Sequence, residues 1–165
     1  MKRRTISLLV AITLTAAILR LFHLDTVPPG VNRDEASIGI TASSLFTTGK
    51  DEYGRTLPLS FESFGDWKLP LYIYTTIPFV KALGLTELAV RLPSALFGIA
   101  SVVAIFFLAN LLFASEVIAL MAALSLALSP WHIHISRVES EAIVAVFFAD
   151  LFGLAVEFEG FAGPL

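Results

Sequence analysis

The chain has 165 residues, of which 56% are hydrophobic and 15% are charged, and its net charge at pH 7 is −3. A soluble domain carries about 25% charged residues, so this composition excludes an ordinary soluble globular protein. The mean hydropathy of +0.82 indicates an integral membrane protein. The sequence has no cysteine, which excludes disulfides and thiolate metal sites, and the small net charge gives no sign of a nucleic-acid partner.

Residues 1–22 are predicted to form a first membrane span. A basic start, residues 2–4, precedes an apolar run over residues 5–22, close to the ~20 residues that cross the hydrocarbon core. Arg20 lies near enough to one end for its side chain to snorkel to the interface. No small-x-small cleavage site follows, so we expect an uncleaved anchor rather than a signal peptide, with its N-terminus in the cytoplasm.

Residues 23–68 form the long polar segment of the chain, and residues 23–88 are predicted to make a first outer loop. Within it, residues 34–46 have helical spacing, with Asn32 or Asp34 as the N-cap. The apolar face of this helix is expected to comprise Ile38, Ala42, Leu45 and Phe46. Glycine and proline make residues 51–66 rich in turns, and an ordered loop is predicted there.

Residues 69–85 are apolar but interrupted by Pro70 and Pro78. Tyrosine favours the membrane interface, so we expect a helix in or near the interface. Pro70 is placed in its first turn, where a missing N–H costs least, and Tyr72 and Tyr74 are placed near the headgroups.

Three further apolar segments are predicted to form spans. They are residues 89–113, 117–128 and 142–156, with Asp150 inside the last. The sequence therefore predicts an all-α polytopic membrane protein with about four transmembrane helices, plus interfacial helices in the first outer loop. Its parts are an N-terminal span, the outer loop, a helical hairpin with a fourth span, and an atypical tail: residues 1–22, 23–88, 89–156 and 157–165.

The acidic pair Asp34 and Glu35 is the first candidate for chemistry. An acidic pair at a helix start commonly serves the helix dipole, but this one lies at the bilayer edge, where a carboxylate can act as a general base for a hydroxyl or amine. Lys68 and Arg91 also have two interpretations. Each is either an interfacial cation or a positive charge that holds a phosphate.

A second polar cluster lies in the predicted outer loop 131–141. His132 and His134 either bind a divalent metal together with Glu139 or Glu141, or form hydrogen bonds. His-x-His on a helix points to different faces, which favours hydrogen bonding. Arg137 and Glu141 are one helical turn apart and can pair.

Four sequence features, in order, resemble the N-terminal part of the type C (GT-C) membrane glycosyltransferases. The resemblance is greatest to the protein O-mannosyltransferase and lipid A aminoarabinose transferase group. The features are the acidic pair Asp34-Glu35, the run Lys68 to Tyr72, the signature Arg91 to Gly98, and Ser129-Pro130 followed by Ser136-Arg137 and Glu141.

The resemblance implies an inverting glycosyltransferase in the cell membrane, with its active site outside. The donor would be a sugar on a polyprenyl phosphate, and the acceptor a lipid, glycan or protein. Asp34 would be the catalytic base with Glu35 beside it. Lys68 would contact the donor phosphate, helped by Arg91, and Glu141 would occupy the place of an acid in the second outer loop.

Two other functions fit parts of the sequence. A transporter or channel fragment would use Asp150 as an intramembrane relay, and an inactive membrane remnant would use none of these residues. Members of the resembled group are several times longer, so we expect this chain to be a truncated or frameshifted product. Sugar-transfer assays separate the enzyme from the transporter, and the downstream reading frame tests the truncation.

The predicted topology places residues 36 and 140 on the same, non-cytoplasmic side. Because the native chain has no cysteine, Ala36→Cys and Ser140→Cys each introduce a single thiol. A membrane-impermeant thiol reagent applied from the outside should label both variants. Labelling of the two positions from opposite sides would contradict the topology.

Overall fold

The computed structural model describes residues 1–63, 65–138 and 141–161. These residues form a mostly helical fold with a single β-hairpin. In chain order the elements are α1 (Arg3–Leu21), α2 (Arg33–Thr48), β1 (Phe61–Ser63), β2 (Asp66–Lys68), α3 (Pro70–Leu83), α4 (Glu87–Phe113), α5 (Glu116–Leu128), α6 (Pro130–Ile135) and α7 (Glu141–Phe161).

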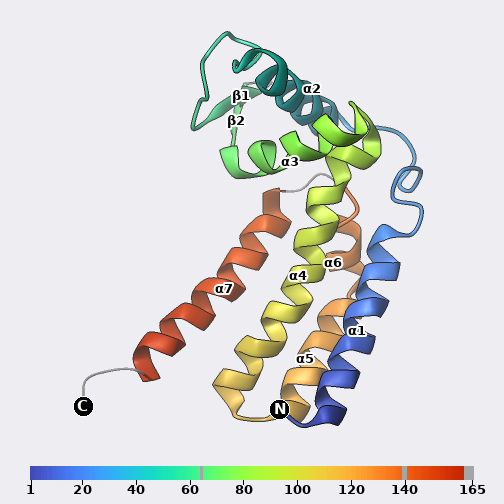
Figure 1. The fold of residues 1–165 in the computed structure, drawn as a ribbon, viewed down its shortest axis with the longest axis vertical. Helices are drawn as coiled ribbons and strands as arrows, with labels where there is room; N and C mark the ends of the chain where they lie inside the picture. Colours follow the sequence, from blue (N-terminus) through green and yellow to red (C-terminus); the bar gives the residue numbers. More distant parts are fainter. Residues whose placement is uncertain (64, 139–140, 162–165) are drawn as a thin grey trace.

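The long helices form a bundle with a small cap at one end (Figure 1). Helices α1, α4 and α5 run side by side, and α7 packs along α4. Helix α4 is the central element, since it packs against α1, α3, α5 and α7. The cap consists of α2, the hairpin and α3, at the end where α1 finishes and α4 begins, whereas the N-terminus lies at the other end beside the α4–α5 turn.

Two helices of the described chain, α1 and α4, are long and apolar enough to cross a membrane by length and composition. Helix α5 is apolar but shorter, with 13 residues. Helix α7 covers the predicted fourth span. The structure therefore supports a helical membrane protein with two candidate spans, and the number four stays a prediction.

Small residues let the bundle helices approach closely. Alanine side chains of α1, α4 and α5 fill the contact and are almost completely buried: Ala16, Ala109, Ala119, Ala123 and Ala127. Close packing of this kind holds helices together where lipid removes the hydrophobic driving force. Gly98 of α4 allows a close approach of the residue that follows α6, because a Cβ atom there would lie 2.8 Å from Ser136 Cβ.

Helix α2 begins with a capping box. The Asn32 side chain accepts a hydrogen bond from the Glu35 N–H at 2.7 Å, and the Glu35 carboxylate accepts one from the Asn32 N–H at 3.0 Å. Two N–H groups that the helix start leaves unpaired are thereby satisfied. The helix ends at Gly49, which has a φ of 71°, the left-handed conformation that glycine adopts readily.

The predicted apolar face of α2 is partly correct. Ile38, Ala42 and Leu45 are buried, but Phe46 is 46% exposed. The Phe46 ring lies under the ammonium of Lys81 from α3, at 5.4 Å from the ring centroid. Helical periodicity placed Phe46 on the same face as Ala42. Near the C-terminal end of α2, however, the ring lies at the protein surface under the Lys81 ammonium and not in the core.

The predicted loop 51–66 contains a feature that the turn signals did not reveal. Strands β1 and β2 pair antiparallel, with Phe61 opposite Lys68. The hairpin is three residues long on each side, too short for a visible alternation of polar and apolar residues. It brings Lys68 to the surface of the cap directly before α3.

Helix α3 lies crosswise to the bundle helices (Figure 1). It begins at Pro70, as predicted, and its 14 residues rise about 21 Å, less than the ~30 Å of the hydrocarbon core. The expectation that Tyr72 lies at the headgroups is wrong. Tyr72 is buried, and its hydroxyl donates to the Val90 carbonyl at 2.7 Å, because this face of α3 packs on α4.

Candidate active site

A buried arginine joins the start of α4 to the start of α2. The Arg91 side chain is fully buried. Its Nε donates to Glu35 Oε1 at 2.7 Å and one terminal nitrogen donates to Glu35 Oε2 at 3.1 Å. This two-pronged contact is the strongest arrangement open to an arginine and a carboxylate. The other terminal nitrogen lies 3.3 Å from Glu87 Oε2.

The same guanidinium holds the connection between α1 and α2. It donates to the carbonyls of Leu24 at 3.2 Å, Pro28 at 3.0 Å and Gly30 at 2.6 Å. Its N–H donors are thus directed at protein oxygens inside the fold. The expectation that Arg91 contacts a donor phosphate does not fit this geometry, because the buried guanidinium is committed to Glu35 and to the loop.

Glu35 and Asp34 are neighbours with different environments. The Glu35 side chain is 2% exposed and faces Arg91, whereas the Asp34 side chain is 55% exposed. Successive residues of a helix point about 100° apart, as 3.6 residues per turn requires. The capping box and the arginine therefore fix Glu35 inside the fold and leave the Asp34 carboxylate on the outer surface of the cap.

The hairpin brings a lysine to this carboxylate. Lys68 Nζ lies 3.1 Å from Asp34 Oδ1 and 3.4 Å from the Asp34 backbone oxygen. The Lys68 side chain is 12% exposed, so its stem is packed while its head reaches the carboxylate. Asp34 and Lys68 are 34 residues apart in sequence, and the hairpin brings their side chains into contact.

The start of α7 reaches the same place. Glu141 Oε1 accepts a hydrogen bond from the Leu69 N–H at 2.9 Å, directly beside Lys68. The first and second predicted outer loops thus meet at the end of the hairpin. Asp34, Lys68 and Glu141 form one polar cluster at the surface of the cap, contributed by α2, β2 and α7.

The two histidines of the second loop are separated. His132 is buried, and its Nδ1 lies 2.8 Å from a terminal nitrogen of Arg20, while His134 is exposed. Burial and then the positive charge of Arg20 lower the pKa of His132 to about 4. No three His, Cys, Asp or Glu side chains in the described parts of the chain are placed to hold a metal ion. His132, His134 and Glu141 are therefore not brought together as a metal site, and Glu139 lies outside the described residues.

Arg20 is a structural residue that the sequence analysis misplaced. It does not snorkel to the interface but is fully buried. Its guanidinium donates to the carbonyls of Ala16, Leu126 and Ala127 at 3.1 to 3.2 Å. A charged residue within a span is costly in lipid and generally faces protein. The position of Arg20 inside the predicted first span was therefore the sequence signal that favoured burial.

Arg137 closes the end of α1 instead of pairing with Glu141. It donates to the carbonyls of Leu19 and Phe22 at 2.8 Å each, and to those of His23 and Val27 at 3.2 and 3.0 Å. The last carbonyls of a helix have no partner within it, which makes them suitable acceptors for a cation. Arg137 thereby fixes the second loop against the exit of the first span.

The fold and this cluster define a helical membrane protein with an acid–lysine site at one end of its bundle, the arrangement expected of a GT-C membrane glycosyltransferase. The family model described as dolichyl-phosphate-mannose-protein mannosyltransferase matches residues 10–151. This match covers most of the chain, and the chain belongs to that family. No curated protein and no solved structure gave a significant match.

The environment of His132 predicts a dependence of stability on pH. Because the folded pKa of about 4 lies below the ordinary value of ~6.5, the unfolded chain binds a proton between these values that the folded chain does not. The free energy of unfolding should fall as the pH drops from 6.5 to 4, by about 3 kcal/mol at most.

Denaturation in detergent across this pH range measures the effect. His132→Gln should flatten the profile relative to the unmutated chain. The exposed His134→Gln serves as the matched control and should retain the slope. Parallel profiles for the unmutated chain and His132→Gln would contradict the assignment.

Proposed function

We propose that this chain transfers mannose from a polyprenyl-phosphate donor to a hydroxyl of a protein acceptor, on the non-cytoplasmic side of the membrane. The family supports a membrane mannosyltransferase with such a donor. The observation that carries the assignment to particular residues is the 3.1 Å contact between Asp34 and Lys68. It supplies a base and a cation at one exposed point, as the reaction requires.

Asp34 is the proposed general base. Its carboxylate is exposed and accepts the proton of the acceptor hydroxyl. The hydroxyl oxygen attacks the anomeric carbon of mannose, and the bond from that carbon to the phosphate oxygen breaks. The polyprenyl phosphate leaves with the bonding electrons, so the configuration at the anomeric carbon inverts.

Lys68 is the proposed phosphate ligand. Charge develops on the leaving phosphate as its bond to the sugar breaks, and a fixed cation stabilises that charge more in the transition state than in the ground state. The ammonium is a compact charge with three donors. On donor binding it exchanges part of its contact with Asp34 for the phosphate, which frees the carboxylate for the acceptor.

Glu35, Arg91 and Glu141 are proposed as positioning residues. The Glu35–Arg91 pair fixes the first turn of α2, on which Asp34 lies. Glu141 fixes the residue after Lys68 through the Leu69 N–H. Positioning of reacting groups accounts for a large part of enzymatic rate enhancement, so the inward-facing Glu35 contributes without touching the substrate.

Asp34→Asn tests the proposed base. It keeps the shape of the side chain and removes the proton acceptor, so mannosyl transfer from polyprenyl-phosphate mannose to an acceptor peptide should fall about 10²–10⁴-fold. Binding of the donor to the chain in nanodiscs should change little. Glu62→Gln is the matched control, because Glu62 is an exposed cap carboxylate that is paired with Arg55, and should retain both transfer and binding.

Lys68→Gln separates the second role. It should weaken binding of the polyprenyl-phosphate donor, whereas the control Lys81→Gln, which changes another lysine of the cap, should not. Unchanged transfer in Asp34→Asn, or unchanged donor affinity in Lys68→Gln, would contradict the corresponding assignment.

A further inference from the structure

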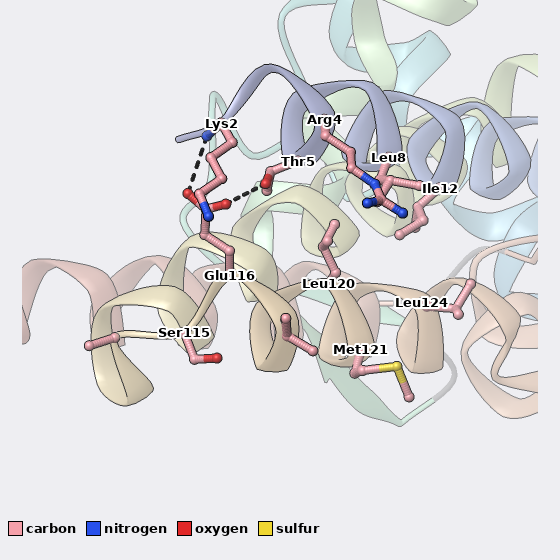
Figure 2. Close-up of a pocket in the computed structure, with 12 residues that line it drawn as sticks. Lys2, Arg4, Thr5, Leu8, Ile12, Ser115, Glu116, Leu120, Met121 and Leu124 are labelled. Atoms are coloured by element: carbon pink, nitrogen blue, oxygen red, sulfur yellow. Dashed lines mark hydrogen bonds between the residues drawn. The ribbon is translucent and has the colours of Figure 1, made fainter.

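A groove lies at the end of the bundle away from the Asp34 cluster, between the first turns of α1 and α5. Its volume is about 810 Å³, and Figure 2 shows its walls. The mouth is polar, with Lys2 and Arg4 from the start of the chain and Glu116 from α5. The deeper wall is apolar, and is formed by Leu8, Ile12, Leu120, Met121 and Leu124.

The carboxylate at the mouth is already engaged. Glu116 accepts hydrogen bonds from the Thr5 hydroxyl and from the Lys2 N–H, and the amino group of Met1 lies 3.7 Å away. The hydrogen bond from Thr5 is the largest cause of a lowered pKa of Glu116, so this group is charged at neutral pH. Its negative charge is engaged by these groups at the N-terminus of the chain.

Arg4 is placed differently from its neighbours. Figure 2 shows its side chain extending along α1, with the guanidinium beside Leu8 on the apolar wall. Within the described residues Arg4 makes no ion pair. A guanidinium beside apolar side chains, at the end of a membrane helix, is complementary to an anion that carries an apolar chain.

We propose that this groove binds one anionic phospholipid of the surrounding leaflet. The lipid phosphate contacts Arg4, and an acyl chain lies along the apolar wall between α1 and α5. The positive side chains that line the mouth, Lys2 and Arg4, outnumber its single carboxylate, Glu116. The basic N-terminus is predicted to lie in the cytoplasm, and the cytoplasmic leaflet is the one that carries anionic lipid.

The site is distinct from the proposed donor site and does not depend on it. The two lie at opposite ends of α1 and α4 (Figure 1). Bound lipid would bridge α1 and α5, two helices that already pack together. We therefore expect a lipid that remains with the protein through detergent extraction, in contrast to lipids that exchange freely around it.

Native mass spectrometry of the chain extracted from phosphatidylcholine–phosphatidylglycerol nanodiscs tests the proposal. One phosphatidylglycerol should be retained per chain. Arg4→Gln should reduce its affinity about fivefold, the effect of one basic residue near an anionic surface. Arg3→Gln is the matched control. It removes the same charge at the neighbouring position, where the side chain does not line the groove, so this variant should retain the lipid.

Met121→Trp supplies a second measurement. Met121 is 58% exposed on the apolar wall, so a larger ring there fills the groove and should displace the lipid without disturbing the core. Circular dichroism verifies that each variant is folded. Equal loss in Arg3→Gln and Arg4→Gln would overturn the proposal, as would equal retention of phosphatidylcholine. A dimer that Met121→Trp dissociates would also overturn it, by showing that a second copy of the chain occupies the groove.

Discussion

The contact between Arg91 and Glu35 is the constraint on which the cap end of the molecule depends. It places a buried charge pair between α4 and α2 and adds three carbonyls of the α1–α2 connection to the same guanidinium. Removing one partner of such a pair leaves an uncompensated buried charge and typically costs about 3–5 kcal/mol. Because Glu35 also closes the capping box of α2, the clamp fixes both the position and the first turn of the helix that carries Asp34.

Three further polar contacts extend this arrangement to the second loop. Arg137 binds the carbonyls at the end of α1, and Arg20 contacts His132 at the start of the same loop. Glu141 then contacts the backbone after Lys68. The two fully buried arginines, Arg20 and Arg91, therefore satisfy backbone oxygens of neighbouring segments. The charged residues of the bundle hold its loops in place, and the pair that we propose for chemistry, Asp34 and Lys68, lies at the surface of the cap.

The sequence predicted the helices better than the roles of the charges. Helical spacing, the Asn32 cap and Pro70 located α2 and α3, and the order of motifs indicated the family. The three-residue strands escaped notice because periodicity needs a longer run. Arg91 and Arg20 were misjudged because composition shows that a cation is present but not which way it points. Asp34 and Glu35 illustrate the same limit, since adjacent carboxylates receive opposite environments only once α4 is packed against α2.

Carbodiimide cross-linking measures the contact between Asp34 and Lys68 directly, because the reagent joins a carboxylate to a neighbouring amine through an amide bond. Asp34 and Lys68, 3.1 Å apart, should give a cross-linked peptide in the native chain. Arg91→Lys keeps the charge but loses the two-pronged contact with Glu35, so the yield should fall several-fold while circular dichroism shows unchanged helix content. Arg55→Lys, the same substitution at an exposed pair, should leave the yield unchanged. An undiminished Asp34–Lys68 cross-link in Arg91→Lys would contradict the claim that the buried clamp sets the geometry of the site.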